Sequence, residues 1–401
     1  YQVSHDVKTA LKKTLLPGSS MFESMGFAYM GPVDGHDVES LEQALRWAKE
    51  QRRPVLLHVR TVKGRGYAPA EEHPADYHGV SPFVPDTGRP LKPSGTDFSH
   101  VFGQELTKLA GEDDRVCAIT AAMQEGTGLT EFARKYPKRL FDVGIAEGHA
   151  VSMAGGMAKQ GLVPVFAVYS SFLQRGYDQL MQDVALDGLH VVLGVDRAGL
   201  VGADGETHHG CFDALYLAQV PHMTVLCPAS FAELRQMLRR AVLELTGPVA
   251  VRYPRGGEGA YRGCCGNETF TELRQGSDCT ILTYGILINE ALAAAELLHQ
   301  AGIEARVVKL NAIAPLRNDE VLAALGHEKR LLVLEDCVGS GCVGQRLTAI
   351  LAQQGCAPDK LFLKNLGDTI PCHGSVSQLY AQCGLDAASV AEALKEACHE
   401  Q

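Results

Sequence analysis

The stretch RLFDVGIAEGHAVSMAGGMAKQGLVPVFAVYSSF (residues 139–172) decides the fold, because it reads as a strand, a helix and a second strand in succession. The same alternation of strand-like and helix-like runs extends over residues 98–258 and starts again at residue 277. Strands that alternate with helices are typical of parallel sheets covered by helices on both faces. The sequence therefore predicts an α/β fold with doubly wound, mostly parallel sheets.

Two segments with little periodicity divide the chain. Residues 79–97 contain four prolines and three glycines, and residues 259–276 show no clear pattern of helix or strand. Stretches of this kind between periodic segments are typical of linkers. We predict linkers at 81–97 and 259–276, which leave three parts, at residues 1–80, 98–258 and 277–401.

The first part reads as the last section of a domain. It contains a helix-like run at 38–51 and a strand-like run at 54–62, and we expect no strand ahead of GPVDGHD (31–37). The chain also begins without an initiator methionine.

Composition narrows the classes of function. The formal net charge is −10 and no lysine or arginine cluster is present, which speaks against nucleic acid as a partner. The twelve cysteines form no CxxC pair, so we expect reduced thiols in a cytoplasmic protein. No apolar run approaches the ~20 residues of a membrane span, and no signal peptide is visible, so we expect no membrane partner.

Basic and aromatic side chains follow three of the predicted strands. Tyr169 and Arg175 come after one strand, Arg197 after the next, and Arg255 after a third. Because the carboxyl ends of parallel strands meet at one edge of a sheet, these side chains are expected to converge there. Arginine binds phosphate with two parallel hydrogen bonds, so the set fits a phosphorylated substrate. The alternative is that each arginine lies on the surface and pairs with a nearby acid.

Two acidic positions allow more than one interpretation. Glu147 stands where a strand runs into a helix, so it is either a helix N-terminal acid or a dry carboxylate that handles a proton. In ADGETHHG (203–210), Asp204 lies four residues before His208 and could orient it. His208 and His209 could instead bind a metal, although no full ligand set is visible nearby.

Several motifs occur in order along the chain: GPVDGHD, KGRGYAPAE with YHGV, FDVGIAEGHA, YSSFLQRGYDQ, DRAGLVGADGETHHG and RYPRG. They resemble the 1-deoxy-D-xylulose-5-phosphate synthases, thiamine-diphosphate enzymes of the transketolase superfamily. YSSFLQR together with DRAGLVGADGETHHG is specific to that family. The resemblance implies the end of a diphosphate-binding domain at 1–80, a transketolase-like pyrimidine-binding domain at 98–258 and a transketolase C-terminal domain at 277–401.

The resemblance implies a transferase that condenses pyruvate with D-glyceraldehyde 3-phosphate. Its products are CO2 and 1-deoxy-D-xylulose 5-phosphate, a precursor of isoprenoids, thiamine and pyridoxal. The implied cofactors are thiamine diphosphate and Mg²⁺. Glu147 matches the glutamate that hydrogen-bonds the pyrimidine ring nitrogen, Phe172 matches the aromatic residue that stacks on the pyrimidine, and Tyr67 matches a cofactor contact.

The resemblance also implies roles for the remaining candidates. Asp204 and His208 match groups that line the substrate channel, and His78 matches a histidine near the reacting carbon. The implied catalytic residues are thus Glu147, His78 and His208. The residues that match the acceptor phosphate and nearby substrate groups are Tyr169, Arg175, Arg197 and Arg255.

The chain departs from the family in two respects. Gly148 replaces a residue that is usually larger and polar, which we expect to loosen the start of the helix without removing Glu147. The GDG…N motif that carries the Mg²⁺ ligands is missing, so we expect those ligands in an N-terminal segment outside this chain, which alone should bind cofactor poorly. The family implies a homodimer. The alternatives are a transketolase-type or 2-oxoacid dehydrogenase β-type subunit, or a non-catalytic module of the same fold.

Overall fold

The computed structural model describes residues 17–399 apart from 75, 81, 92–94 and 265. It contains two compact units, Tyr1–Ser94 and Gly95–Gln401. Among the described residues, no helix is both long and apolar enough to cross a membrane.

The first unit contains a small parallel sheet. β1 (Ala28–Asp34) pairs in parallel with β2 (Val55–Arg60), and α3 (Val38–Glu50) connects them. Asp37 caps α3 by accepting hydrogen bonds from two backbone N–H groups of its first turn. The expectation of no strand before residue 31 was wrong, because Pro32, which lacks an N–H group, lies inside β1 and hides its pattern. The unit also contains α2 (Pro17–Ser24) and α4 (Ala68–Glu72).

A seven-stranded sheet forms the middle of the second unit, in the order β12-β7-β8-β6-β5-β3-β4. Every neighbouring pair is parallel except β12 with β7. This confirms the predicted parallel α/β fold. The strands are β3 (Val116–Thr120), β4 (Leu140–Asp142), β5 (Val163–Tyr169), β6 (Val192–Asp196), β7 (Thr224–Leu226), β8 (Val249–Arg252) and β12 (Ala312–Ala314).

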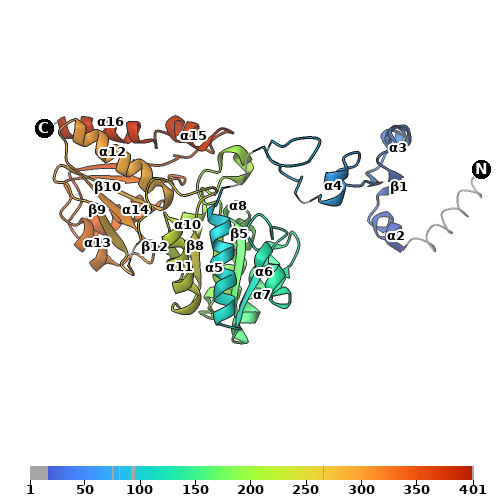
Figure 1. Ribbon diagram of the computed structural model, residues 1–401, viewed down its shortest axis with the longest axis horizontal. Coiled ribbons are helices and arrows are strands. Elements are labelled where there is room, and N and C mark those ends of the chain that lie inside the picture. Colours follow the sequence, from blue (N-terminus) through green and yellow to red (C-terminus); the bar gives the residue numbers. More distant parts are fainter. Residues whose placement is uncertain (1–16, 75, 81, 92–94, 265, 400–401) are drawn as a thin grey trace, which may run out of the picture. The chain divides into compact units, whose positions relative to one another are not determined.

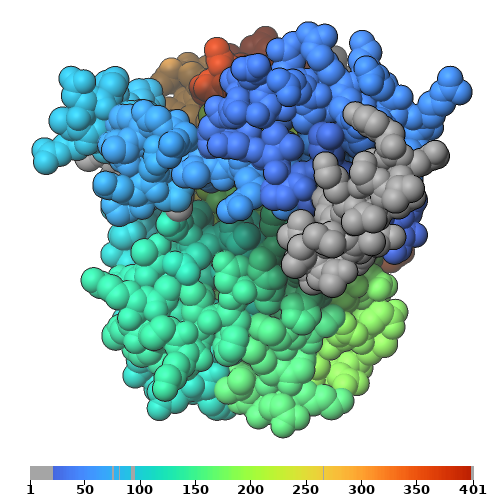
Figure 2. Space-filling view, turned by 90° about the vertical axis from the view of Figure 1, so that its right-hand side faces the viewer, coloured from blue at the N-terminus to red at the C-terminus, as the bar shows by residue number. Residues whose placement is uncertain are grey.

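Both faces of this sheet are buried, because successive side chains of a strand point to opposite sides. On β5, Val165 and Ala167 pack in the core with α5 (Phe98–Glu112) and α11 (Phe231–Leu243), whereas Phe166 and Val168 pack in the core with α7 (Glu147–Lys159). Figure 1 shows α5 and α7 beside this sheet. The space-filling view shows the teal and green side chains of this region as a closely packed surface (Figure 2). The remaining helices are α6 (Thr130–Lys135), α8 (Ser170–Leu173), α9 (Tyr177–Gln179) and α10 (Asp213–Leu217).

A second, five-stranded sheet has the order β14-β13-β10-β11-β9, with β9 antiparallel to β11. β9 lies inside the segment 259–276 that we expected to be a linker. The other predicted domain limits stay predictions. The strands are β9 (Phe270–Arg274), β10 (Cys279–Tyr284), β11 (Ala305–Leu310), β13 (Arg330–Leu334) and β14 (Lys360–Lys364). The helices are α12 (Ile288–Gln300), α13 (Asn318–Leu325), α14 (Val343–Gln353), α15 (Val376–Cys383) and α16 (Ala387–His399).

The two sheets of the second unit are joined by shared structure. We call residues 98–258 the central lobe and residues 270–399 the C-terminal lobe. β12, which follows β11 of the C-terminal lobe, completes the sheet of the central lobe by pairing with β7. Short 3-10 or π-helical turns lie at Pro137–Arg139 (η1), Gln174–Gly176 (η2), Leu180–Ala185 (η3), Gly202–Asp204 (η4), Glu206–His208 (η5) and Gly285–Leu287 (η6).

Candidate functional site

Three neighbouring parallel strands end together at one edge of the central sheet. Tyr169 at the end of β5 lies opposite Asp196 at the end of β6, and Val195 of β6 lies opposite Arg252 at the end of β8. The segments that carry the candidate arginines therefore leave the sheet side by side. This confirms the prediction that the three strand ends share one edge.

Four side chains at this edge form a continuous row, which we call the arginine–aromatic row. The Arg197 guanidinium carbon lies 3.7 Å from the centre of the Tyr169 ring. Tyr169 stacks on Phe172 with 5.6 Å between ring centres and an angle of 24°. The Arg175 guanidinium carbon lies 5.2 Å from the Phe172 ring centre. Cations over aromatic faces are attracted by the ring electrons, so the row holds two positive charges in fixed places.

Arg197 occupies the inner end of the row. Its side chain is only 14% exposed, and its backbone has a φ of 59°, which is unusual for a residue other than glycine. Its Nη1 donates to the carbonyl oxygen of Gly126 at 3.1 Å and lies 3.3 Å from Asp196 Oδ1. Its Nε is buried without a hydrogen-bond partner. These contacts hold the guanidinium in place.

Asp204 joins two of the predicted arginines. Its carboxylate lies 3.6 Å from Arg197 Nε and 3.3 Å from Arg255 Nη1. Arg255 also donates to the carbonyl oxygen of Val201 at 3.2 Å. Both sequence interpretations therefore apply, because the arginines converge and each also has an acidic partner. Arg175 stands apart from this pair, at the opposite end of the row.

Asp196 was not selected from the sequence, where it reads only as the last residue of a strand. It is fully buried, and the Ser99 hydroxyl donates to its Oδ2 at 2.6 Å. Burial raises the pKa of Asp196 from 3.8 to about 6, although Arg197 and the Ser99 hydrogen bond favour its charged form. A charged residue directly after a run of buried strand residues was the signal that could have found it.

Glu147 is the first residue of α7, and its side chain is 3% exposed. Arg175 Nη1 donates to Glu147 Oε1 at 2.9 Å, while the Arg175 side chain is 57% exposed. The acid therefore combines the two properties that the sequence left open, since it begins a helix and is also shielded from water. Through Arg175 it adjoins the Phe172 end of the arginine–aromatic row.

α7 begins at Glu147, so Gly148 lies in its first turn. A Cβ atom at position 148 would lie 3.2 Å from Gln179 Oε1, so a larger residue would press on Gln179. Gln179 Oε1 is itself buried without a hydrogen-bond partner. The glycine leaves room for Gln179, and the expectation that it loosens the start of the helix stays a prediction.

His208 lies next to the row. Its ring meets Phe172 edge-on, with 5.3 Å between ring centres. The hydroxyl of Thr207 lies 2.8 Å from His208 Nδ1. In the described part of the chain, no group of three or more His, Cys, Asp or Glu side chains could hold a metal ion. His208 and His209 therefore do not belong to such a group.

Comparisons with known proteins give the family of each part of the chain. A model described as "Transketolase, pyrimidine binding domain" matches residues 94–257, and one described as "Transketolase, C-terminal domain" matches residues 269–390. A model described as "1-deoxy-D-xylulose-5-phosphate synthase" matches residues 1–61. The 1-deoxy-D-xylulose-5-phosphate synthase of Heliobacterium modesticaldum is 43% identical over 98% of this chain and 62% of its own length. The chain belongs to the 1-deoxy-D-xylulose-5-phosphate synthase family.

Other relatives of this synthase family give the same result. The "1-deoxy-D-xylulose-5-phosphate synthase 1" of Geobacter metallireducens is 44% identical over 97% of this chain and 63% of its own length. The chain thus spans about three fifths of the length of these curated relatives.

Solved structures support the same fold. A protein titled "Split gene transketolase, inactive beta4 tetramer" is 25% identical with a TM-score of 0.67, over 76% of this chain and 99% of that one. A transketolase of Pichia stipitis in complex with a sugar phosphate has a TM-score of 0.64 at 15% identity, over 76% of this chain and 46% of that one, and shows the fold alone.

The first unit contains the two other residues that the synthase family suggests. The Tyr67 hydroxyl donates to the carbonyl oxygen of Pro85 at 2.7 Å, and its ring packs against Tyr77 and Phe83. His78 Nδ1 lies 3.0 Å from Lys63 Nζ. Tyr67 and His78 belong to the first unit and the other candidate residues belong to the second, so the roles of Tyr67 and His78 stay predictions.

Proposed function

We propose that this chain carries the pyrimidine side and the acceptor-phosphate side of a thiamine-diphosphate-dependent 1-deoxy-D-xylulose-5-phosphate synthase. The proposed reaction condenses pyruvate with D-glyceraldehyde 3-phosphate and releases CO2. The observation that carries the proposal is the arginine–aromatic row, which joins a buried carboxylate at Glu147 to a cationic site at Arg197. The buried carboxylate and the phosphate-binding cations lie at one edge of the sheet. This arrangement fits a cofactor and a phosphorylated substrate that react side by side.

The residues around Glu147 fit the aminopyrimidine of thiamine diphosphate. Glu147 offers a carboxylate shielded from water that can hydrogen-bond a ring nitrogen, and Phe172 offers an aromatic face beside it. When bound, the cofactor supplies nucleophilic carbon chemistry that amino-acid side chains lack. Glu147 would hold the proton at the pyrimidine ring nitrogen, and its burial strengthens that hydrogen bond.

The cationic end fits the phosphate of the acceptor aldehyde. Arg197 Nε makes no hydrogen bond and lies 3.6 Å from Asp204, and Arg255 is 39% exposed and reaches the same acid. An incoming phosphate would bind these guanidinium groups beside Asp204, which holds them in place. Tyr169 and Arg175 extend the site toward Glu147, and Asp204 and His208 would contact the substrate beside it.

The proposal includes further parts that the family suggests. His78 would act in proton transfer, Tyr67 would contact the cofactor, and a homodimer in the cytoplasm would be the working form. As the family suggests, the proposal assigns Mg²⁺ to a GDG…N motif, which these 401 residues do not contain.

Product analysis tests the proposal. The complete polypeptide that contains this chain is incubated with pyruvate, D-glyceraldehyde 3-phosphate, thiamine diphosphate and Mg²⁺, and the products are identified by NMR. We expect 1-deoxy-D-xylulose 5-phosphate and CO2 in equal amounts. In a parallel incubation that adds a ketose phosphate as donor, ketol transfer without formation of deoxyxylulose phosphate would favour a transketolase-type enzyme. No product in either incubation at full cofactor occupancy would contradict an enzymatic role.

A further inference from the structure

His209, the second of two adjacent histidines, is not used by the proposed function. Its ring is buried, and its Nδ1 accepts a hydrogen bond from the backbone N–H of Val201 at 3.2 Å. The ring proton of neutral His209 must then be on Nε2, which lies 3.5 Å from the carbonyl oxygen of Cys372. The His209 ring therefore bridges the loop that bears Asp204 and the C-terminal lobe.

A second histidine makes a similar connection from the opposite direction. His373 Nε2 lies 3.1 Å from the carbonyl oxygen of Ala203. The backbones also approach closely, because a Cβ atom at Gly202, where φ is +66°, would lie 3.0 Å from the carbonyl oxygen of Gly374. We call residues 372–375 of the C-terminal lobe the tie segment.

The turn held by the tie segment also faces the arginines. Within this turn, residues 201–204, the Asp204 carboxylate lies within 3.6 Å of Arg197 and 3.3 Å of Arg255. The Val201 carbonyl accepts from Arg255 as well. The turn thus lies between the C-terminal lobe and the two guanidinium groups, so a shift of the tie segment would move the acid that orients them.

We propose that His373, supported by His209, is a positioning residue for the acceptor-phosphate site. It fixes the turn that carries Asp204, and Asp204 in turn fixes Arg197 and Arg255. This inference rests on the proposed function, because it takes these arginines as the phosphate ligands. It adds that a residue of the C-terminal lobe sets the phosphate affinity of the central lobe.

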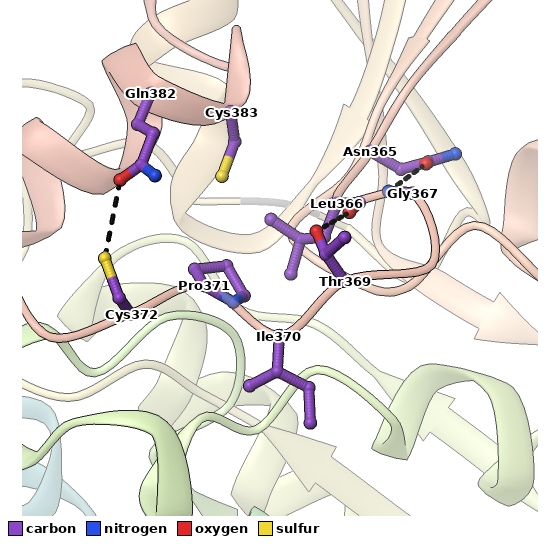
Figure 3. A pocket seen from close by; sticks show the side chains of 9 residues that line it. All are labelled: Asn365, Leu366, Gly367, Thr369, Ile370, Pro371, Cys372, Gln382 and Cys383. Carbon is purple, nitrogen blue, oxygen red and sulfur yellow. Dashed lines mark hydrogen bonds between the residues drawn. The ribbon is translucent and has the colours of Figure 1, made fainter.

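The surroundings of the tie segment make its contacts with the turn decisive. A cavity of about 520 Å³ lies between the loop after β14 and α15, and Pro371 and Cys372 line it together with Ile370 and Gln382 (Figure 3). Because one side of Pro371 and Cys372 faces this cavity, packing alone does not fix the segment. The hydrogen bonds of His373 and His209 therefore add to what holds the segment against the turn.

Hydrogen exchange and phosphate binding test this inference on the full chain. The variants are His373→Ala and His373→Gln, and the glutamine keeps a hydrogen-bond donor. The control variant is His299→Ala, because His299 is an exposed histidine of the same lobe that pairs with Glu304. The measurements are hydrogen exchange of residues 199–210 by mass spectrometry, titration with inorganic phosphate followed by ³¹P NMR, and urea unfolding.

We expect His373→Ala to speed amide exchange in residues 199–210 and to weaken phosphate binding about fivefold, the size expected for one lost hydrogen bond. His373→Gln should recover most of the affinity, and His299→Ala should change neither quantity. The urea midpoint of His373→Ala should stay near that of the wild type, because His373 is exposed. If the Ala variant does not fold, His373→Asn is judged by the same criteria.

Two results separate this inference from the proposed function. If the wild type binds phosphate and His373→Ala binds it equally well with unchanged exchange, the inference is overturned and the phosphate site stands. If the wild type does not bind phosphate, the assignment of Arg197 and Arg255 fails. In that case exchange alone decides whether His373 holds the turn, and unchanged exchange again overturns the inference.

Discussion

At the scale of single residues, Arg255 is the guanidinium that a phosphate can reach most directly. It is partly exposed and is held by the Asp204 carboxylate and the Val201 carbonyl oxygen. We expect Arg255→Ala to raise the KM for D-glyceraldehyde 3-phosphate by about 10- to 100-fold, the value of one or two charge-assisted hydrogen bonds. Steady-state kinetics of the complete polypeptide should show little change in the KM for pyruvate.

Arg239→Ala is the matched control for this prediction. Arg239 belongs to α11 of the same lobe but pairs with Glu112, away from the candidate residues. It should leave both KM values unchanged. An equal rise of both KM values in Arg255→Ala would mean that the phosphate site is misplaced.

Asp196 gives a prediction about pH. Its pKa is raised to about 6 in the folded protein, with burial as the main cause, against a usual value of 3.8. The folded state therefore binds a proton that the unfolded state has already lost between about pH 4 and 6, so the contribution of Asp196 to stability falls as pH rises through this window.

The variant Asp196→Asn removes this titration. We compare the free energy of unfolding of the wild type with that of the variant. Their difference, wild type minus variant, should fall by up to about 3 kcal/mol from pH 4 to pH 7, because the pKa of Asp196 is raised by about two units. Urea titrations at several pH values measure it. The groups that act on Asp196 are Arg197, Ser99 and Asp97. A difference that is constant with pH would contradict the raised pKa.

Sequence reasoning selected most of the residues that the structure brings together at this sheet edge, because their types are unusual after apolar strands. Arg197 and Arg255 stand out after buried strands, and Glu147 stands out at a strand–helix junction. The sequence could not show the ion pair between Arg175 and Glu147, because it depends on the path of the chain through η2. Nor could it show that Asp204 pairs with two arginines, since those contacts span three loops.

At the scale of elements, the loop before α6 supports the row through a close approach. A Cβ atom at Gly126 would overlap the Tyr169 hydroxyl, and the Gly126 carbonyl oxygen accepts from Arg197. We expect Gly126→Ala to push Tyr169 aside and to weaken binding of inorganic phosphate by at least about tenfold. Arg197 would then lose its fixed place, because the Tyr169 ring beneath it and the Gly126 carbonyl oxygen that accepts from it both shift. A ³¹P NMR titration measures the affinity.

Gly156→Ala is the matched control for Gly126→Ala. Gly156 lies in α7, and a Cβ atom there would meet nothing within 4 Å. This variant should leave phosphate affinity unchanged and should raise stability by about 0.5–1 kcal/mol, because alanine favours a helix over glycine. Normal phosphate affinity in Gly126→Ala would show that the row does not shape the phosphate site.

The sequence predicted long elements better than short ones. The runs that became α7 and β5 are long and periodic, and the structure confirms them. β7 and β12 have three residues each, too few for a visible alternation. β9 lies among glycines and charged residues, and its place is set by pairing with β11 rather than by its own pattern.

At the scale of the whole molecule, a buried ion pair joins the two lobes of the second unit. Lys309 of β11 lies 3.0 Å from Glu233 of α11, and both side chains are 0% exposed. Glu233 also accepts from the Tyr261 hydroxyl and the Ala229 N–H, and Lys309 donates to Asn311. The network therefore spans the central lobe, the segment between the lobes and the C-terminal lobe.

We expect Lys309→Met to lower the free energy of unfolding by about 3–5 kcal/mol, because it leaves Glu233 buried without its cation. The double variant Lys309→Met/Glu233→Leu should recover a large part of this loss, because neither charge then remains. Urea unfolding of the single and double variants measures the coupling. Strictly additive effects would show that the two side chains do not depend on each other.

The division into two lobes was visible in the sequence, but their connection was not. The alternation of strands and helices stops near residue 258 and starts again near 277, which indicates two sheets. The crossing of β12 into the central sheet depends on pairing between residues far apart in the chain, and no local pattern reports it. The buried Lys309 and Glu233 likewise read as ordinary polar residues of a strand and a helix.

The central claim is that Glu147 meets the pyrimidine of a thiamine cofactor beside a phosphate-binding row. The most direct measurement is turnover of Glu147→Ala at saturating thiamine diphosphate, in the complete polypeptide, with phosphate affinity measured in parallel. The account predicts that formation of 1-deoxy-D-xylulose 5-phosphate falls by at least about 100-fold while phosphate affinity changes little. Turnover close to that of the wild type would contradict it.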